Sequence, residues 1–210
     1  MFATSELELF ELVVRILADT APREMADAIL MYGQTESNEI STLGRASEIW
    51  RAGLAERIVF GRGGKLVKGD PWEPGYDSKL ARLGVHSGAI IPVQITAELA
   101  HTQTEANSLV QFAQKEGWQR VYVVSSPFHQ LRAFVGTVTA ILRQGARLKA
   151  FSMPGLALPW TEEAVHSQNV VTGKRFKLLK GELDRMNAYY EHGDLVTARE
   201  ALDYLDQRDQ

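Results

Sequence analysis

The sequence predicts an α/β fold, with a Rossmann-like open, mostly parallel sheet that carries helices on both faces, followed by a C-terminal helical hairpin. Short apolar runs without polar alternation are typical of strands covered on both faces. Helical segments alternate with these runs at the spacing of parallel βαβ units. From residue 161 onward the apolar pattern is helical. We therefore expect a Rossmann-like domain over 1–160, including an N-terminal helix, and a hairpin appendage over 161–210.

The composition is that of an ordinary globular protein. The chain has 210 residues, 45% of them hydrophobic and 23% charged, which suffices for one sizeable core. A net charge of −3 gives no global positive field that would recruit nucleic acid or acidic lipid. The absence of cysteine excludes disulfides, thiolate metal sites and cysteine nucleophiles. No apolar stretch approaches the ~18 residues of a membrane span, and the N-terminus lacks the features of a signal peptide, so we expect a cytoplasmic protein without nucleic-acid or membrane partners.

The N-terminal segment is expected to form an amphipathic helix. Leu7, Phe10, Val14 and Leu17 recur at helical spacing, and Pro22 closes the segment. We expect this stripe to pack onto the rest of the domain.

Five strands and four helices are expected between this helix and residue 160. The strands are expected at 26–32, 57–60, 89–93, 120–125 and 147–151, and the helices at 43–52, 78–83, 104–116 and 129–143. Alternation at this spacing is what predicts the parallel sheet.

The expected C-terminal hairpin contains two apolar helical stripes. One consists of Phe176, Leu179, Leu183, Met186 and Tyr190, and the other of Leu195, Ala198, Ala201, Leu202 and Leu205. Gly193 is expected to end the first helix, and Asp194 to cap the second. The polar residues of this region form no convergent group, so we expect it to cover the sheet domain, or to serve as an interaction surface, without contributing to a ligand site.

Ligands of open parallel sheets bind beyond the carboxyl ends of the strands, where the strand order reverses. The first strand is followed by Gly33, which permits close backbone approach, and by the polar Gln34. Arg45 is expected one turn into the next helix, facing either solvent or a ligand anion. The alternative is a solvated loop in which Ser41 or Thr42 caps that helix.

The second strand is followed by a glycine-rich turn. Gly61, Gly63 and Gly64 expose backbone N–H groups that can hold an anion. The turn is not a Walker phosphate loop, because Leu66 follows Lys65, and it is not a GxGxxG fingerprint. The alternative is a purely structural turn.

The third candidate region lies at the start of the helix expected from residue 104. Thr102 or Thr104 is a natural cap, and Glu105 lies near the positive end of the helix dipole. Capping accounts for Thr102 and Glu105 but leaves the nearby His101 unexplained. Glu105 is also a candidate catalytic residue.

The fourth region follows the strand expected at 120–125. Ser125 and Ser126 end this strand, and His129 and Arg132 fall on one face of the following helix. Hydroxyls, a helix start, an imidazole and a guanidinium suit an anion or phosphate site. His129 is the best candidate general acid or base, with a pKa that the adjacent arginine lowers. The alternative is a capped helix with a surface arginine.

Two other kinds of site are disfavoured. No GxSxG element is present, so a serine hydrolase of that type is not expected. His86, His166 and His192 are isolated in the sequence, and no HxxxH pair occurs, so no metal site is expected.

In this order, these motifs resemble the YdcF/SanA/ElyC family of bacterial proteins, a domain of unknown function. The resemblance covers about residues 26–155, in which Val123 to Ala133 match the last family motif. Thr102, Glu105 and Ala106 match the preceding one. The resemblance implies a Rossmann-like fold with a site at the strand exits, and S-adenosylmethionine or nucleotide binding in a cytoplasmic, YdcF-like branch.

The expected function is therefore binding of an anionic or nucleotide-like small molecule, with a transferase activity as one form of it. A phosphate-ester hydrolase or phosphotransfer enzyme is one alternative, and a non-catalytic ligand sensor acting through the C-terminal hairpin is another. A homo-oligomer is a further expectation. Arg132 is expected to contribute to binding and little to stability.

Overall fold

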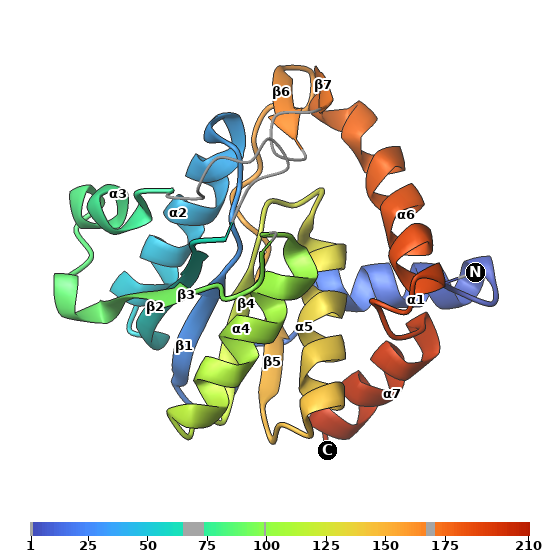
Figure 1. The fold of residues 1–210 in the computed structure, drawn as a ribbon, viewed down its shortest axis with the longest axis horizontal. Coiled ribbons are helices and arrows are strands. Elements are labelled where there is room, and N and C mark those ends of the chain that lie inside the picture. Colours follow the sequence, from blue (N-terminus) through green and yellow to red (C-terminus); the bar gives the residue numbers. More distant parts are fainter. Residues whose placement is uncertain (1, 65–73, 99, 167–170) are drawn as a thin grey trace.

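The computed structural model describes residues 2–64, 74–98, 100–166 and 171–210, and its centre is a five-stranded, all-parallel sheet (Figure 1). The strands are β1 (Ala26–Met31), β2 (Ala55–Arg62), β3 (Ile90–Gln94), β4 (Arg120–Val124) and β5 (Lys149–Ser152). Their order is β3-β2-β1-β4-β5, which reverses between β1 and β4. The predicted α/β, Rossmann-like class is confirmed, and the topological switch point lies between β1 and β4.

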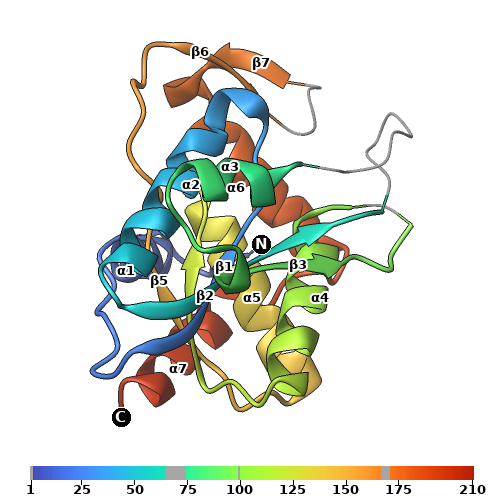
Figure 2. The ribbon, with the colours of Figure 1, turned by 90° about the vertical axis from the view of Figure 1, so that its left-hand side faces the viewer.

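Helices cover both faces of the sheet, because successive side chains of each strand point to opposite faces. Ala28 and Leu30 pack on the side of α4 (Thr102–Lys115) and α5 (Gln130–Gln144). Ile29 and Met31 pack on the side of α2 (Glu36–Arg51) and α3 (Tyr76–Arg82), which is followed by a short 3-10 turn, η1 (Ser87–Ala89). Figure 2 shows α2 and α4 on opposite sides of the strands.

Helix α2 begins at Glu36, two turns earlier than expected, with Thr35 as its cap residue. The expectation that Ser41 or Thr42 caps it is therefore wrong, since both lie inside the helix and are fully buried. The buried face of its first turns is polar, so the apolar period begins only at Leu43.

Helix α1 (Glu6–Leu17) forms as expected, but it buries a different stripe. Leu12 and Ile16 are fully buried against the α5 side of the sheet. The expected stripe is exposed, with exposed fractions of 75% for Leu7, 66% for Phe10, 46% for Val14 and 44% for Leu17. Apolar residues occupy most of the helix circumference, so periodicity alone did not select the buried face.

The region after residue 160 contains an antiparallel pair of strands that the sequence did not predict, β6 (Glu163–His166) and β7 (Val171–Lys174). Helix α6 (Arg175–Glu191) follows, and a turn with Gly193 at φ 77° leads to α7 (Ala198–Arg208). The cap of α7 is Thr197, in a capping box with Glu200, so the expected role of Asp194 is wrong.

The two expected C-terminal stripes have different outcomes. The stripe around α7 is buried as expected, against α1 and α5. On α6, Met186 is buried, whereas Phe176, Leu179 and Leu183 are exposed. The buried face of α6 instead carries Leu178 and Glu182. None of the helices in the described ranges is both long and apolar enough to cross a membrane.

Candidate functional site

Gln34 joins the ends of the two strands that flank the switch point. Its side-chain Nε2 donates to Ser125 Oγ at 3.1 Å, and Ser126 Oγ donates to its Oε1 at 2.8 Å. Its backbone N–H donates to the Tyr76 hydroxyl at 2.8 Å, and this hydroxyl donates to its carbonyl at 2.8 Å. Three predicted site residues thus meet where β1 and β4 end.

Glu105, from the first turn of α4, lies beside them and is buried. Its carboxylate accepts hydrogen bonds from the backbone N–H groups of Gly33, at 3.1 Å, and of Gly61. Burial raises its pKa to about 8, although the two backbone hydrogen bonds act in the opposite direction. Near neutral pH the side chain is therefore mostly a neutral acid that can donate a proton. We call Gly33, Gln34, Gly61, Glu105, Ser125 and Ser126 the switch-point cluster.

Glycine is required at each of the three glycine positions of the 61–64 turn for a structural reason, and the reason differs between them. A Cβ on Gly61 would lie 3.1 Å from Cγ of Glu105, so this glycine lets the carboxylate approach the strand end. Gly63 and Gly64 have φ values of 79° and 74°, which favour glycine. The structural alternative for these two is supported, and anion binding by their N–H groups stays a prediction.

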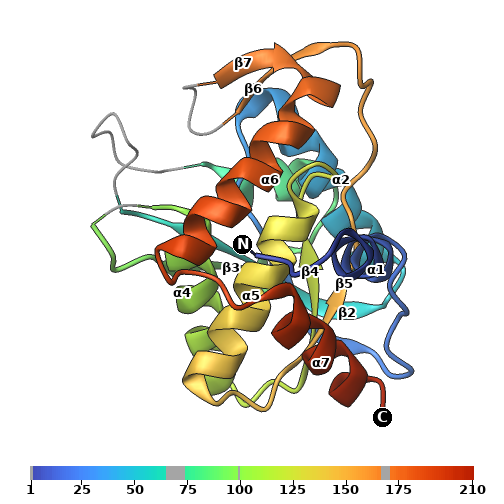
Figure 3. The ribbon, with the colours of Figure 1, turned by 90° about the vertical axis from the view of Figure 1, so that its right-hand side faces the viewer.

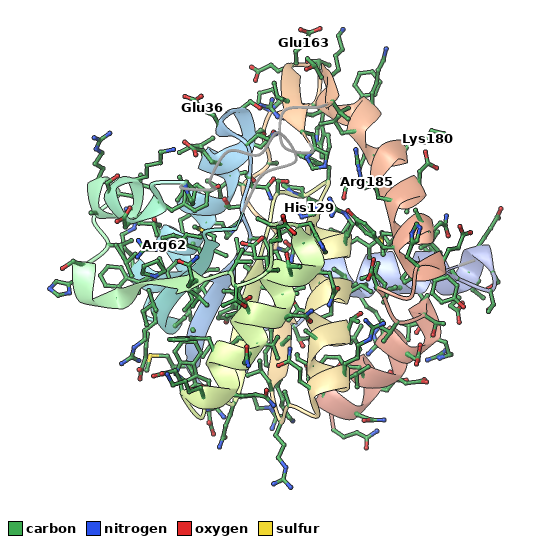
Figure 4. All side chains as sticks on the ribbon, viewed as in Figure 1. Glu36, Arg62, His129, Glu163, Lys180 and Arg185 are labelled. Atoms are coloured by element: carbon green, nitrogen blue, oxygen red, sulfur yellow. The ribbon has the colours of Figure 1, made fainter. Side chains whose placement is uncertain are left out.

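A second group of polar side chains surrounds the carboxylate of Glu182, which α6 inserts against the start of α5. Arg132 donates to it twice, from Nε to Oε2 at 2.7 Å and from Nη2 to Oε1 at 3.2 Å. His129 Nδ1 lies 3.0 Å from Oε2, and His166 Nε2 contacts Oε1. Arg185 Nη1 donates to Oε1 at 2.7 Å. Figure 4 labels His129 and Arg185 on these facing elements.

Thr102 completes this group, because its hydroxyl accepts a hydrogen bond from Arg132. We call Thr102, His129, Arg132, His166, Glu182 and Arg185 the Glu182 cluster. Thr102 and Glu105 lie one helical turn apart on α4, so this helix connects the two clusters. The predicted residues Thr102, Glu105, His129 and Arg132 thus all lie at the carboxyl edge of the sheet.

The Glu182 cluster differs from its expected form in two ways. The polar residues of the C-terminal region were expected to form no convergent group, and that is wrong, because Glu182 contacts both His129 and Arg132. His166 was treated as isolated, and that is also wrong, since β6 brings it to the same carboxylate. Arg132 is no surface arginine either, because it is buried and ion-paired.

Burial and charge set the protonation states in this cluster. Burial alone would raise the pKa of Glu182, but the Arg132 guanidinium and the hydrogen bonds from His129 and His166 hold it well below its usual range. Burial, reinforced by Arg132, lowers the pKa of His129 to about 4. His129 is therefore neutral at neutral pH. Because a carboxylate only accepts, Nδ1 carries the proton, which leaves Nε2 of His129 as an acceptor.

The cluster carries an excess of positive charge. Two guanidiniums, Arg132 and Arg185, face the single carboxylate of Glu182. Even with both imidazoles neutral, the net charge is positive, which favours a nearby anion.

His129, His166 and Glu182 are also residue types that bind metals, and their donor atoms lie within 4.8 Å of one another. A divalent cation there would compete with both guanidiniums for the same carboxylate oxygens and would be repelled by their charge. The arrangement therefore suits an anion better than a metal ion.

The hairpin β6–β7 fixes the position of α6. Asn38, in the first turn of α2, donates from Nδ2 to the Val165 carbonyl at 2.8 Å. Arg175 at the start of α6 donates to Asn38 Oδ1 at 3.1 Å and to the Ser37 carbonyl at 2.8 Å. These contacts fasten the C-terminal region to the switch-point end of α2 and so place Glu182.

Arg45, another predicted site residue, lies further along α2 than expected. Its Nε donates to the Pro154 carbonyl at 3.0 Å, and its Nη1 pairs with Glu48 at 2.9 Å. Its expected role as a ligand contact stays a prediction.

Comparison with known proteins adds no family assignment. No family model matches this chain, and neither a curated protein nor a solved structure matches it. The resemblance to the YdcF/SanA/ElyC family therefore stays a prediction.

Proposed function

We propose that this chain binds a small anionic or nucleotide-like molecule at the carboxyl edge of its sheet, between the ends of β1 and β4 and helix α6. The observation that carries the proposal is the excess positive charge of the Glu182 cluster, in which two guanidiniums face one carboxylate. Its location supports the same function, because ligands of open α/β sheets bind where the strand order reverses.

The two clusters would act on different parts of such a molecule. Arg185, whose side chain is partly exposed, and Arg132 would face its anionic group. The neutral donors and acceptors of the switch-point cluster would face its hydroxyl and amino groups. S-adenosylmethionine and nucleotides belong to this class of anionic or nucleotide-like molecules. Both would be present around a protein located in the cytoplasm. A transferase acting on such a molecule is one form of this proposal.

A phosphate-ester hydrolase or phosphotransfer enzyme is the second candidate, and the two unusual protonation states favour it. Neutral His129 offers Nε2 as a base, and Glu105, with a pKa of about 8, offers a proton to a leaving oxygen. Turnover of a phosphate ester, as opposed to saturable binding alone, would distinguish this enzyme from a non-catalytic ligand sensor.

Calorimetric titration of the full chain with S-adenosylmethionine, adenosine triphosphate and inorganic phosphate tests the proposal. We expect saturable binding of at least one probe. Arg185→Gln should weaken it about tenfold, the loss expected for one charge-assisted hydrogen bond. Arg199→Gln is the matched control, because Arg199 forms an exposed ion pair with Asp203 on α7. Absence of binding, or equal affinities in the two variants, would refute the proposal.

A further inference from the structure

Helix α1 exposes a continuous apolar stripe. Leu7, Phe10, Val14 and Leu17 follow one another at helical spacing, and each is 44% exposed or more. In Figure 1, α1 reaches the right-hand edge of the molecule, beyond the sheet and its covering helices. Exposure of such a stripe to water is unfavourable in free energy, so binding of a partner that covers it would be favourable.

Helix α6 exposes a second apolar stripe, made of Phe176, Leu179 and Leu183, each at least 40% exposed. Figure 3 shows α6 and α1 on the same side of the molecule. The two helices are also connected, because the backbone N–H of Phe2 donates to Asn187 Oδ1 at 3.1 Å. The two helices that carry the stripes therefore lie on one side of the protein.

The size of this apolar surface fits a specific interface. The seven side chains are large, and two of them are phenylalanines. Each partner in a standard interface buries ~800 Å². Seven large side chains, each at least 40% exposed, would contribute to an area of that kind.

The charges beside the two stripes are opposite. Glu6 and Glu11 flank the stripe of α1 and are exposed, and Glu11 lies 3.6 Å from Arg15 of the same helix in a weak ion pair. Lys177 and Lys180 are exposed beside the stripe of α6. Lys180 pairs with Asp184 in an exposed ion pair, which holds it only weakly. In Figure 4, Lys180 points outward from α6, away from the Glu182 cluster.

This pattern identifies the partner. An anionic membrane surface would repel the acidic apolar helix α1. A basic apolar helix would instead complement α1 in both its apolar surface and its charge. A second copy of this chain offers both helices at once. A two-fold axis would place α1 of each copy on α6 of the other, which closes the assembly at two subunits.

We propose that this side of the molecule is the interface of a homodimer, in which α1 of one protomer packs on α6 of its partner. The proposal rests on the exposed stripes and their flanking charges, and it is independent of the ligand proposed above.

The test is a charge-swap cycle on the full chain, followed by sedimentation equilibrium. We expect the wild type to be a dimer. Glu6→Lys with Glu11→Lys, or Lys177→Glu with Lys180→Glu, should each raise the dimer Kd at least tenfold, because each places like charges together. All four substitutions combined should restore the dimer. Asp203→Lys with Arg199→Glu on α7 exchanges an exposed ion pair outside the interface and should leave the Kd unchanged.

An apolar variant provides a second measurement. Leu7→Gln changes the most exposed member of the stripe and should dissociate the dimer without lowering the thermal midpoint of the monomer. A wild type that stays monomeric at its highest soluble concentration would overturn the proposal. So would swaps that fail to compensate each other, or a dimer that Leu7→Gln leaves intact.

Discussion

Glu105 and Glu182 are both buried at the carboxyl edge of the sheet, but their surroundings shift their pKa values in opposite directions. Glu105 accepts from backbone N–H groups and forms no ion pair within the described part of the chain, so desolvation dominates and its pKa rises to about 8. Glu182 meets the Arg132 guanidinium and the His129 and His166 imidazoles, so its pKa falls well below the usual range despite its burial. Equal burial thus gives a neutral acid in one cluster and a permanent anion in the other, depending on the charged partners.

The largest expected effect is the loss of the carboxylate of Glu182. Glu182→Gln keeps the shape of the side chain but leaves Arg132 buried without its counterion. Breaking one side of a buried pair costs roughly 3–5 kcal/mol, and we expect a loss of unfolding free energy of about this size. Urea denaturation measures it.

Asp184→Asn, two residues further along α6, is the matched control. Asp184 forms an exposed ion pair with Lys180, so its loss should change stability by less than about 0.5 kcal/mol. Similar losses in the two variants would show that Glu182 is not a buried counterion. The same contact revises the expectation for Arg132→Ala, which we now expect to destabilise the fold strongly.

The second effect is a difference in pH dependence. The folded protein keeps Glu105 protonated up to about pH 8, whereas the unfolded chain releases this proton near 4.5. Its contribution to stability is therefore complete below about pH 4.5 and is lost as the pH rises toward 8. Glu105→Gln should remove this decline and be more stable than the wild type above pH 8.

Measuring unfolding free energy against pH tests this directly. Parallel curves for the wild type and Glu105→Gln between pH 5 and 8 would contradict a raised pKa for Glu105.

His129 in the Glu182 cluster should make the unfolding free energy depend on pH in the opposite direction to Glu105. The pKa of His129 is about 4 in the folded protein and near 6.5 in the unfolded chain. The unfolded state therefore binds this proton first, and stability is lost as the pH falls from 6.5 toward 4. His129→Gln should flatten that loss. An NMR signal assigned to the His129 ring of the wild type that titrates near 6.5 would rule out the buried neutral state of His129.

The prediction from sequence was accurate where burial leaves a simple pattern. Buried strands appear as unbroken apolar runs, and all five were located. The four residues Thr102, Glu105, His129 and Arg132 were placed at strand exits, because strand direction fixes which chain segments meet at the carboxyl edge.

The prediction was less accurate where long-range packing decides between equivalent faces. On α1 two apolar stripes overlap, and only the contacts with α5 and α7 select Leu12 and Ile16. On α6 the buried face places Glu182 four residues from both Leu178 and Met186. A charged residue in the middle of an apolar stripe was the available signal for a buried ion pair. The meeting of His166 with Glu182 depends on the β6–β7 hairpin, which no local pattern predicted.

The next prediction concerns the close approach of Glu105 to β2. In Gly61→Ala, the new Cβ would lie 2.8 Å from Ile95 Cδ1 and 3.1 Å from Glu105 Cγ. Overpacking of this kind costs typically about 1–3 kcal/mol, and we expect a loss in that range by urea denaturation. Gly173→Ala is the control, because nothing lies within 4 Å of the Cβ position there. An unchanged stability of Gly61→Ala would mean that Glu105 does not pack against this glycine.

The smallest effect is expected within the switch-point cluster, from the neutral hydrogen bond between Ser126 and Gln34. Ser126 Oγ donates to Gln34 Oε1 at 2.8 Å, and the hydroxyl is part-buried in this contact. Neutral hydrogen bonds contribute about 0.5–1.5 kcal/mol, so Ser126→Ala should lose that amount, well below Glu182→Gln. The difference follows from charge, because an unpaired amide oxygen costs less to bury than an unpaired guanidinium. If Ser126→Ala and Glu182→Gln cost the same in urea denaturation, the two clusters would not differ in the way their charges indicate.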